Sequence, residues 1–184
     1  MAGPERLVFF TLRPSPPKPM KLILTALLLF PCLPQSLMAA EGVAAGQPLP
    51  KLAPLLPGAR IPDTAGKVVL LDFWASWCAP CKASFPCLNR LQAKYAAKGL
   101  VIIGIGVDDE AADFTKFAAK MGATFPLVHD SAHKSAAAFS PGAMPSSYLI
   151  DRKGVVRHIH NGFKGAKTEK EYTAEIEALL AEKP

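Results

Sequence analysis

Two cysteines separated by two residues, Cys78 and Cys81, are the residues of this chain best suited to carry out chemistry. At this spacing the two sulfurs can lie on one turn of a helix, close enough to form a disulfide and to be reduced again. The same spacing also provides half of a structural zinc site, which needs a second Cys/Cys or Cys/His pair. The other cysteines, Cys32 and Cys87, are isolated in the sequence, so a redox pair is favoured.

The residues before this pair predict different roles for the two sulfurs. Residues 68–74 are apolar apart from Asp72, as in a strand buried within a parallel sheet. If a helix begins near Cys78, its sulfur lies over unpaired backbone N–H groups at the positive end of the helix dipole. Because that position favours thiolate over thiol, we expect Cys78 to attack the substrate. Cys81, one turn deeper and shielded, should resolve the mixed disulfide.

The segment around the cysteines resembles the active-site motif of a known family. Residues 73–81 read FWASWCAPC. This motif is similar to that of thioredoxin-like proteins, and in particular of the exported TlpA/ResA-type thiol–disulfide oxidoreductases. The resemblance implies an α/β, thioredoxin-like fold with a central mixed β-sheet flanked by helices on both faces. It also implies an enzyme, a protein-disulfide reductase that works by dithiol–disulfide exchange without a cofactor.

The same resemblance implies roles for residues beside the cysteines. Trp77, Ala79 and Pro80 are expected to form the surface that meets the substrate, and Pro80 is typical of proteins with a reducing potential. Asp72 aligns with the buried acid of thioredoxin, which implies that it exchanges protons with Cys81. Burial without a partner would raise the pKa of Asp72. The alternative is an acid at the end of the strand that reaches solvent.

A second motif, Met144-Pro145, precedes an apolar segment at residues 146–150. By resemblance, this peptide bond is cis, Pro145 faces the active-site disulfide, and the backbone of Met144 pairs with the incoming peptide. From the residues alone, an ordinary trans proline at the start of an edge strand is favoured. One position departs from the family: the exported proteins often have a glutamate three residues after the second cysteine, where this chain has Ser84.

Away from these motifs, the hydrophobic pattern predicts strands that alternate with helices. Strands are predicted at residues 68–74 and 100–107, in an extended segment at 124–129, and in a β-hairpin of residues 146–150 and 155–160. Helices are predicted after Cys81, before Gly122, at residues 131–139 and from Thr168, where Thr168-x-x-Glu171 has the pattern of a capping box. Residues 41–61, rich in Pro, Gly and Ala, predict an extended lead-in without a helix. Such alternation gives a mixed sheet covered on both faces.

Residues 1–40 have the pattern of an N-terminal extension and a secretory signal peptide, which leaves residues 41–184 as one thioredoxin-like domain. Met20 and Lys21 precede a run of nine mostly apolar residues, and the segment ends in Ala39-Ala40. The apolar run is too short to span a bilayer comfortably. We expect export to the periplasm with cleavage after Ala39 or Ala40, and Met20 is a candidate for the true start.

Composition and charge limit the partners. The formal net charge is +6, of which residues 1–40 contribute +3, and the remaining +3 is too small to indicate binding to nucleic acid. The resemblance implies protein disulfide substrates, such as apocytochrome c or copper-site proteins, and a membrane thiol–disulfide electron donor. We expect a monomer that contacts the membrane only through an uncleaved signal segment.

Two other functions use the same residues. A copper-delivery protein would hold Cu(I) between Cys78 and Cys81, with Met144 or a histidine assisting. A thiol peroxidase is disfavoured because peroxiredoxins do not use this Trp-Cys-x-Pro-Cys arrangement.

The sequence gives little evidence of a functional role for the histidines or for Cys87. The spacings His129/His133 and His158/His160 could hold a metal, but the sequence places no acid or cysteine with them, so no metal site is expected. Cys87 lies six residues after Cys81, about 9 Å along a helix axis, which is too far for a bridge. We expect it to be a buried, inert thiol.

Overall fold

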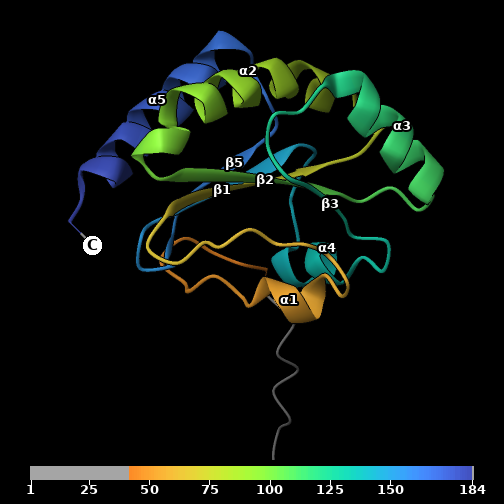
Figure 1. The fold of residues 1–184 in the computed structure, drawn as a ribbon, viewed down its shortest axis with the longest axis horizontal. Helices are drawn as coiled ribbons and strands as arrows, with labels where there is room; N and C mark the ends of the chain where they lie inside the picture. The colour runs from red at the N-terminus through yellow and green to blue at the C-terminus, as the bar shows by residue number, and fades with distance from the viewer. Residues whose placement is uncertain (1–41, 184) are drawn as a thin grey trace, which may run out of the picture. The chain divides into compact units, whose positions relative to one another are not determined.

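Five strands form one mixed sheet at the centre of residues 42–183, the part of the chain that the computed structural model describes (Figure 1). The strands are β1 (Val68–Trp74), β2 (Leu100–Gly106), β3 (Leu127–His129), β4 (Ser146–Ile150) and β5 (Val156–Asn161). Their order across the sheet is β3-β2-β1-β4-β5, with β1, β2 and β3 parallel and β4 and β5 antiparallel to their neighbours. β1 therefore lies in the middle of the sheet, and all of its residues are buried.

Helices cover both faces of this sheet, as the sequence predicted. The longer helices α2 (Ala79–Tyr95), α3 (Ala111–Met121) and α5 (Ala166–Ala181) lie on one face (Figure 1). The short helices α1 (Leu52–Leu55) and α4 (Lys134–Phe139) lie on the other, and a 3₁₀ turn, η1 (Ala96–Lys98), follows α2. The α/β, thioredoxin-like fold class predicted from the sequence is confirmed.

Alternating side chains of β1 form the core on each face, because successive residues of a strand point in opposite directions. The Trp74 ring stacks on Phe117 of α3 at a centroid distance of 4.8 Å. The Phe73 ring packs on the opposite face against Phe139 of α4, at 5.1 Å. Burial of each such ring stabilises the fold by ~1.5–3 kcal/mol. The strand that leads to the cysteines is therefore fixed from both sides.

Close packing of α3 on the sheet depends on Gly106 at the end of β2. A Cβ atom at this position would lie 2.5 Å from the Phe114 ring and 2.8 Å from the Trp74 ring. Only glycine leaves room for both rings, so a side chain here would push α3 away from the end of β1.

Two expectations about local structure were wrong. The lead-in contains the one-turn helix α1, which packs Leu52 into the core. The last helix begins at Ala166, because Gly165 enters it with a φ of 61°. Thr168 is therefore inside the helix, where its hydroxyl accepts a hydrogen bond from the Lys164 N–H at 3.0 Å; no side-chain cap is formed.

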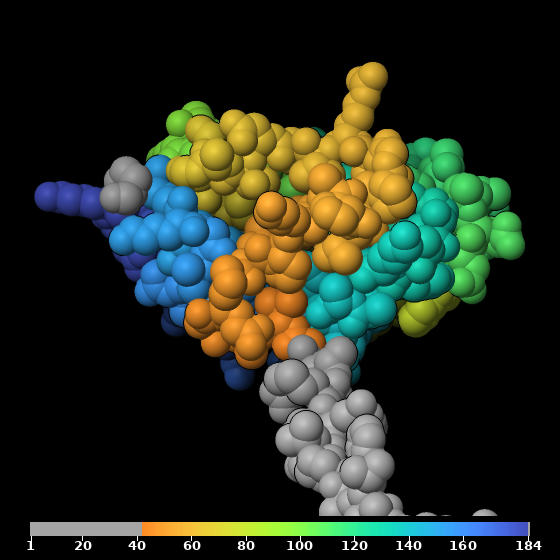
Figure 2. Space-filling model, turned by 90° about the horizontal axis from the view of Figure 1, so that it is seen from below, coloured from red at the N-terminus to blue at the C-terminus, as the bar shows by residue number. Residues whose placement is uncertain are grey.

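Apart from α1, residues 42–61 form no further helix and no strand, only turns and irregular segments. Pro48 pairs with Val155 through an isolated antiparallel bridge. Figure 2 views the molecule from the side of α1 and α4. The lead-in, in orange, crosses this side between the blue residues of the β4–β5 region and the teal residues around α4 (Figure 2).

The predicted signal peptide lies outside the described residues. No helix within residues 42–183 combines the length and the apolar character that a membrane span requires.

Candidate active site

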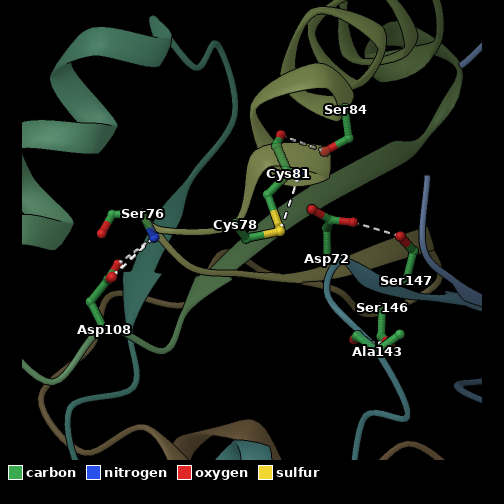
Figure 3. Close-up of a disulfide and its surroundings, with 9 residues drawn as sticks. All are labelled: Asp72, Ser76, Cys78, Cys81, Ser84, Asp108, Ala143, Ser146 and Ser147. Carbon is green, nitrogen blue, oxygen red and sulfur yellow. Dashed lines mark hydrogen bonds between the residues drawn. A yellow bond between two sulfur atoms is a disulfide. The ribbon is translucent and has the colours of Figure 1, made fainter. Parts of the chain in front are cut away.

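Cys78 and Cys81 form a disulfide where β1 passes into α2 (Figure 3). Their Cα atoms are 5.3 Å apart. Cys78 is the N-cap of α2, and its sulfur accepts a hydrogen bond from the Cys81 backbone N–H at 3.1 Å. Pro80 occupies the first turn, where its missing N–H leaves no helical hydrogen bond unmade. The helix therefore begins where the sequence predicted, with the Cys78 sulfur over its N-terminus.

The two cysteines are both almost completely buried, whereas their neighbour Trp77 is largely exposed to solvent. Cys81 is fully buried, whereas Cys78 is 4% exposed. Trp77, directly before Cys78, is 71% exposed and is the exposed large hydrophobic residue of the described part of the chain. Trp77 is therefore an exposed apolar surface directly beside Cys78; its contact with a substrate stays a prediction.

Asp108 fixes the loop that carries Trp77. Its buried carboxylate accepts hydrogen bonds from the Ser76 backbone N–H, at 3.0 and 3.2 Å to the two oxygens. Its own carbonyl accepts one from His129 Nε2 at 2.7 Å. The sequence analysis did not single out Asp108. Its position just after β2, parallel to β1, was the signal for this contact, since parallel strands end at one edge of a sheet.

Asp72 is fully buried in β1, on the side of α2 (Figure 3). Its Oδ1 accepts a hydrogen bond of 2.5 Å from the Ser147 hydroxyl, a partner that the sequence analysis missed. Burial raises the pKa of Asp72 to about 7, although the bond from Ser147 lowers it. Oδ2 has no hydrogen-bond partner and lies on the side of the disulfide (Figure 3). The alternative of a solvent-facing acid is therefore wrong.

The Met144–Pro145 peptide bond is cis, as expected from the resemblance. Ser146, which follows it, pairs with Phe73 of β1. Because β4 runs antiparallel to β1, the start of β4 and the end of β1 meet at one edge of the sheet. Met144 and Pro145 are thus at the edge that also carries Cys78. Their contact with a substrate stays a prediction.

Two further residues of α2, Ser84 and Cys87, were considered in the sequence analysis, and both are buried. Ser84, at the position of the family's glutamate, is buried, and its hydroxyl donates to the Cys81 carbonyl at 2.9 Å. No carboxylate therefore comes from this turn of the helix. Cys87 is a buried free thiol, and burial raises its pKa to about 12. The expectation of an inert thiol agrees with both observations.

The histidines of β5 have acidic neighbours that the sequence did not reveal. His158 Nδ1 lies 3.5 Å from Glu175 Oε1, and His160 Nε2 lies 2.7 Å from Glu175 Oε2. Glu175 comes from α5, far along the chain, so spacing alone could not bring it to them. Within residues 42–183, no three His, Cys, Asp or Glu side chains gather as a metal site would require.

Comparisons with known proteins agree with this geometry. The model of the Redoxin family matches residues 45–176. Thiol-disulfide oxidoreductase ResA of Geobacillus kaustophilus is 33% identical over 120 residues, which cover 65% of this chain and 67% of that protein. Thioredoxin-like protein YneN of Bacillus subtilis is 32% identical over 142 residues, covering 74% of this chain and 81% of that protein.

A solved structure extends the similarity to the whole described fold. A Chlorobium tepidum protein whose crystal structure carries the name thiol:disulfide interchange protein DsbE superposes with a TM-score of 0.70 and 37% sequence identity. The match covers 76% of this chain and 100% of that one. A redox-active pair at the start of α2, a family model that spans most of the chain and relatives of this kind lead to one conclusion: the chain belongs to the Redoxin family and is a TlpA/ResA-type, thioredoxin-like thiol–disulfide oxidoreductase.

Proposed function

We propose that this oxidoreductase is exported and reduces disulfides in periplasmic proteins through Cys78 and Cys81. The observation that carries the proposal is the Cys78 sulfur at the N-terminus of α2, bonded to the Cys81 N–H. This position stabilises a thiolate. The intervening Ala79 and Pro80 add no charge and no side-chain donor, so the thiolate is not stabilised as strongly as in oxidising proteins. A reducing potential follows.

The exchange runs in two steps that balance. The Cys78 thiolate of the reduced protein attacks one sulfur of the substrate disulfide; a mixed disulfide forms, the substrate S–S bond breaks, and the released thiolate takes a proton from water. The Cys81 thiolate then attacks the Cys78 sulfur, which forms the Cys78–Cys81 disulfide and releases the second substrate thiolate. The substrate gains two electrons, and the protein loses two.

Asp72 supports the second step in this proposal. Cys81 is fully buried, so its proton has no direct exit to solvent. The Oδ2 atom of Asp72, which has no hydrogen-bond partner, lies on the side of the disulfide (Figure 3). Because the pKa of Asp72 is about 7, its carboxylate can both accept and return a proton near neutral pH. Asp72 is thus the general base that activates Cys81.

The surface around Cys78 defines how a substrate binds. Trp77, Ala79 and Pro80 are the chain neighbours of Cys78, and the Met144–Pro145 peptide precedes β4 at the same edge of the sheet. An extended substrate segment can pair with the Met144 backbone while its cysteine reaches Cys78. Apocytochrome c and copper-site proteins are the proposed substrates. A membrane thiol–disulfide donor is proposed to return the monomeric protein to its reduced form.

Equilibration of the Cys78–Cys81 pair with a glutathione buffer tests the direction of electron flow. We expect a reduction potential nearer to thioredoxin's, about −270 mV, than to the roughly −120 mV of a strong oxidant. A value more positive than about −180 mV would make the protein an oxidant or an isomerase. Trapping with Cys81→Ser, which stops the reaction at the mixed disulfide, then identifies the substrates, and Cys78→Ser is the control that should trap nothing.

Export needs a separate test, because residues 1–40 lie outside the described structure. Expression of the full chain in a Gram-negative host and fractionation of the cells should place it in the periplasm, shortened to begin at Ala40 or Glu41. A chain that lacks residues 20–40 is the matched control and should stay in the cytoplasm. Equal distribution of both chains would contradict export.

A further inference from the structure

A row of polar side chains crosses the sheet within its otherwise apolar core. Asp72 of β1 pairs with Ser147 of β4, and Ser147 pairs with His160 of β5. Residues paired directly across antiparallel strands point to the same face. Tyr172 of α5 covers this row, with its hydroxyl 2.6 Å from the Ser147 hydroxyl. Asp72, Ser147 and Tyr172 are each fully buried.

The protons in this row can be assigned by counting donors. The Ser147 hydroxyl has one proton, and it donates that proton to Asp72 Oδ1. The Tyr172 hydroxyl must then be the donor in its bond with Ser147. Burial raises the pKa of Tyr172, so this hydroxyl keeps its proton at any physiological pH. The bonds therefore run in one direction, from Tyr172 through Ser147 to Asp72.

This direction makes the two oxygens of Asp72 unequal. Oδ1 already accepts a short bond from Ser147, whereas Oδ2 has no partner and lies on the side of the disulfide (Figure 3). A proton that arrives at the carboxylate is therefore favoured on Oδ2. The bond from Ser147 also stabilises the carboxylate form, which offsets part of the effect of burial on its pKa.

We propose that Ser147 and Tyr172 are positioning residues of the exchange reaction, which hold Asp72 so that Oδ2 takes and returns the proton of Cys81. Neither residue touches the substrate or the reacting sulfurs in this scheme; both act through Asp72. The inference rests on the proposed role of Asp72 as the base for Cys81.

Titratable groups approach Asp72 from two of the three helices on its face of the sheet, α2 and α5. Cys81 and Cys87 come from α2, and Tyr172 comes from α5, where the pKa of Tyr172 responds to the charges of Asp72 and Glu175. His160, beside Glu175, lies edge-on against the Tyr172 ring at 4.9 Å.

The test separates the two steps of the exchange. Reduced full-length protein is mixed with an aromatic disulfide whose released thiolate is coloured, so that the first release reports attack by Cys78 and the second reports attack by Cys81. The variants are Ser147→Ala, Tyr172→Phe and Asp72→Asn. Tyr148→Phe is the matched control, because the Tyr148 hydroxyl is also buried but donates to the Phe139 carbonyl on the opposite face of the sheet.

We expect the second release to slow roughly fivefold at neutral pH in Ser147→Ala, because loss of a hydrogen bond to a charged group moves the Asp72 midpoint up by about one pH unit. Tyr172→Phe should slow it by about twofold, since Ser147 keeps its bond but loses its donor. The first release should keep its rate in both. Carboxyl NMR of the oxidised protein should show the same order of Asp72 midpoints, which makes the result independent of the kinetic assay.

The outcomes distinguish this inference from the proposed function. Wild-type midpoints and rates in both Ser147→Ala and Tyr172→Phe would overturn the inference, and so would an equal effect in Tyr148→Phe. If Asp72→Asn itself leaves the rate of the second release unchanged, Asp72 is not the base for Cys81, and the inference that rests on that role fails with it. If Asp72→Asn slows the second release and Ser147→Ala does not, only the inference fails.

Discussion

Cys78 and Cys87 lie on the same helix and are almost equally hidden, with 4% and 1% of their surfaces exposed. Their surroundings nevertheless differ. Cys78 is at the N-cap, where its sulfur accepts a backbone N–H, while Cys87 lies in the middle of the helix, where burial raises its pKa to about 12. Position on the helix and polar partners, more than exposure, therefore decide which sulfur of α2 reacts.

The largest effect should come from removing the reactive sulfur. Cys78→Ser is expected to lower disulfide reduction by roughly a thousandfold or more, because the nucleophile is lost. Cys81→Ser should still attack and then stop as a mixed disulfide. Mass spectrometry of the protein after reaction with a disulfide peptide measures both. A mixed disulfide at Cys81 in the Cys78→Ser protein would reverse the roles.

The next effect concerns the base for Cys81. Asp72→Asn should slow the resolving step by roughly a hundredfold at neutral pH and remove its midpoint near pH 7. Asp113→Asn, which changes an exposed acid of α3, is the control and should keep the wild-type rate. A resolving step that keeps its pH profile in Asp72→Asn would assign proton transfer to solvent.

Asp72 should also make folding stability depend on pH. Its pKa is raised from 3.8 to about 7, so the folded protein binds a proton more tightly than the unfolded chain does. Stability from this group is therefore greatest below pH 3.8 and is lost as the pH rises through about 7.

Denaturant unfolding of the oxidised protein measures this contribution as a difference between wild type and Asp72→Asn. Between about pH 5 and about pH 8, wild type should lose on the order of 2–3 kcal/mol relative to the variant. The same difference at both pH values would show that Asp72 has an ordinary pKa.

The smallest effect should come from the inert sulfur. Cys87→Ala is expected to keep wild-type exchange rates and to lose roughly 1 kcal/mol of stability through the small cavity that it leaves. In the native protein, Cys87 should resist alkylation under conditions that modify reduced Cys78 completely. Loss of activity in Cys87→Ala, with folding intact, would contradict the contrast between the two sulfurs.

Elements whose pattern is local could be predicted from the sequence. The apolar run of β1 gave its bounds, Val68–Trp74, and the position of Cys78 at the helix start followed from the motif beside it. The cis bond at Pro145 needed the family resemblance, because a proline alone favours trans. The bounds of β1 and the helix start at Cys78 are each decided by residues close together in the chain.

Contacts between distant elements could not be predicted in the same way. Ser147 meets Asp72 only through the register of β4 on β1, and Tyr172 reaches Ser147 only when α5 packs on that face. No local pattern sets a register between strands that far apart in the chain. The predicted start of α5 was wrong for a related reason. Thr168 and Glu171 fit the pattern of a capping box, but the helix begins earlier, at Ala166, with Gly165 as its N-cap.

The two tryptophans of the chain lie close together in the sequence, Trp74 at the end of β1 and Trp77 in the loop before Cys78, but in opposite environments. Trp74 is fully buried among the rings of α2 and α3, so its fluorescence follows the integrity of the core. Trp77 is 71% exposed and is bonded directly to Cys78, whose disulfide can quench an indole close to it. Replacing one tryptophan at a time by phenylalanine would therefore give two optical reporters in one small protein. One would report unfolding, and the other would report the oxidation state of the active site and the arrival of a substrate.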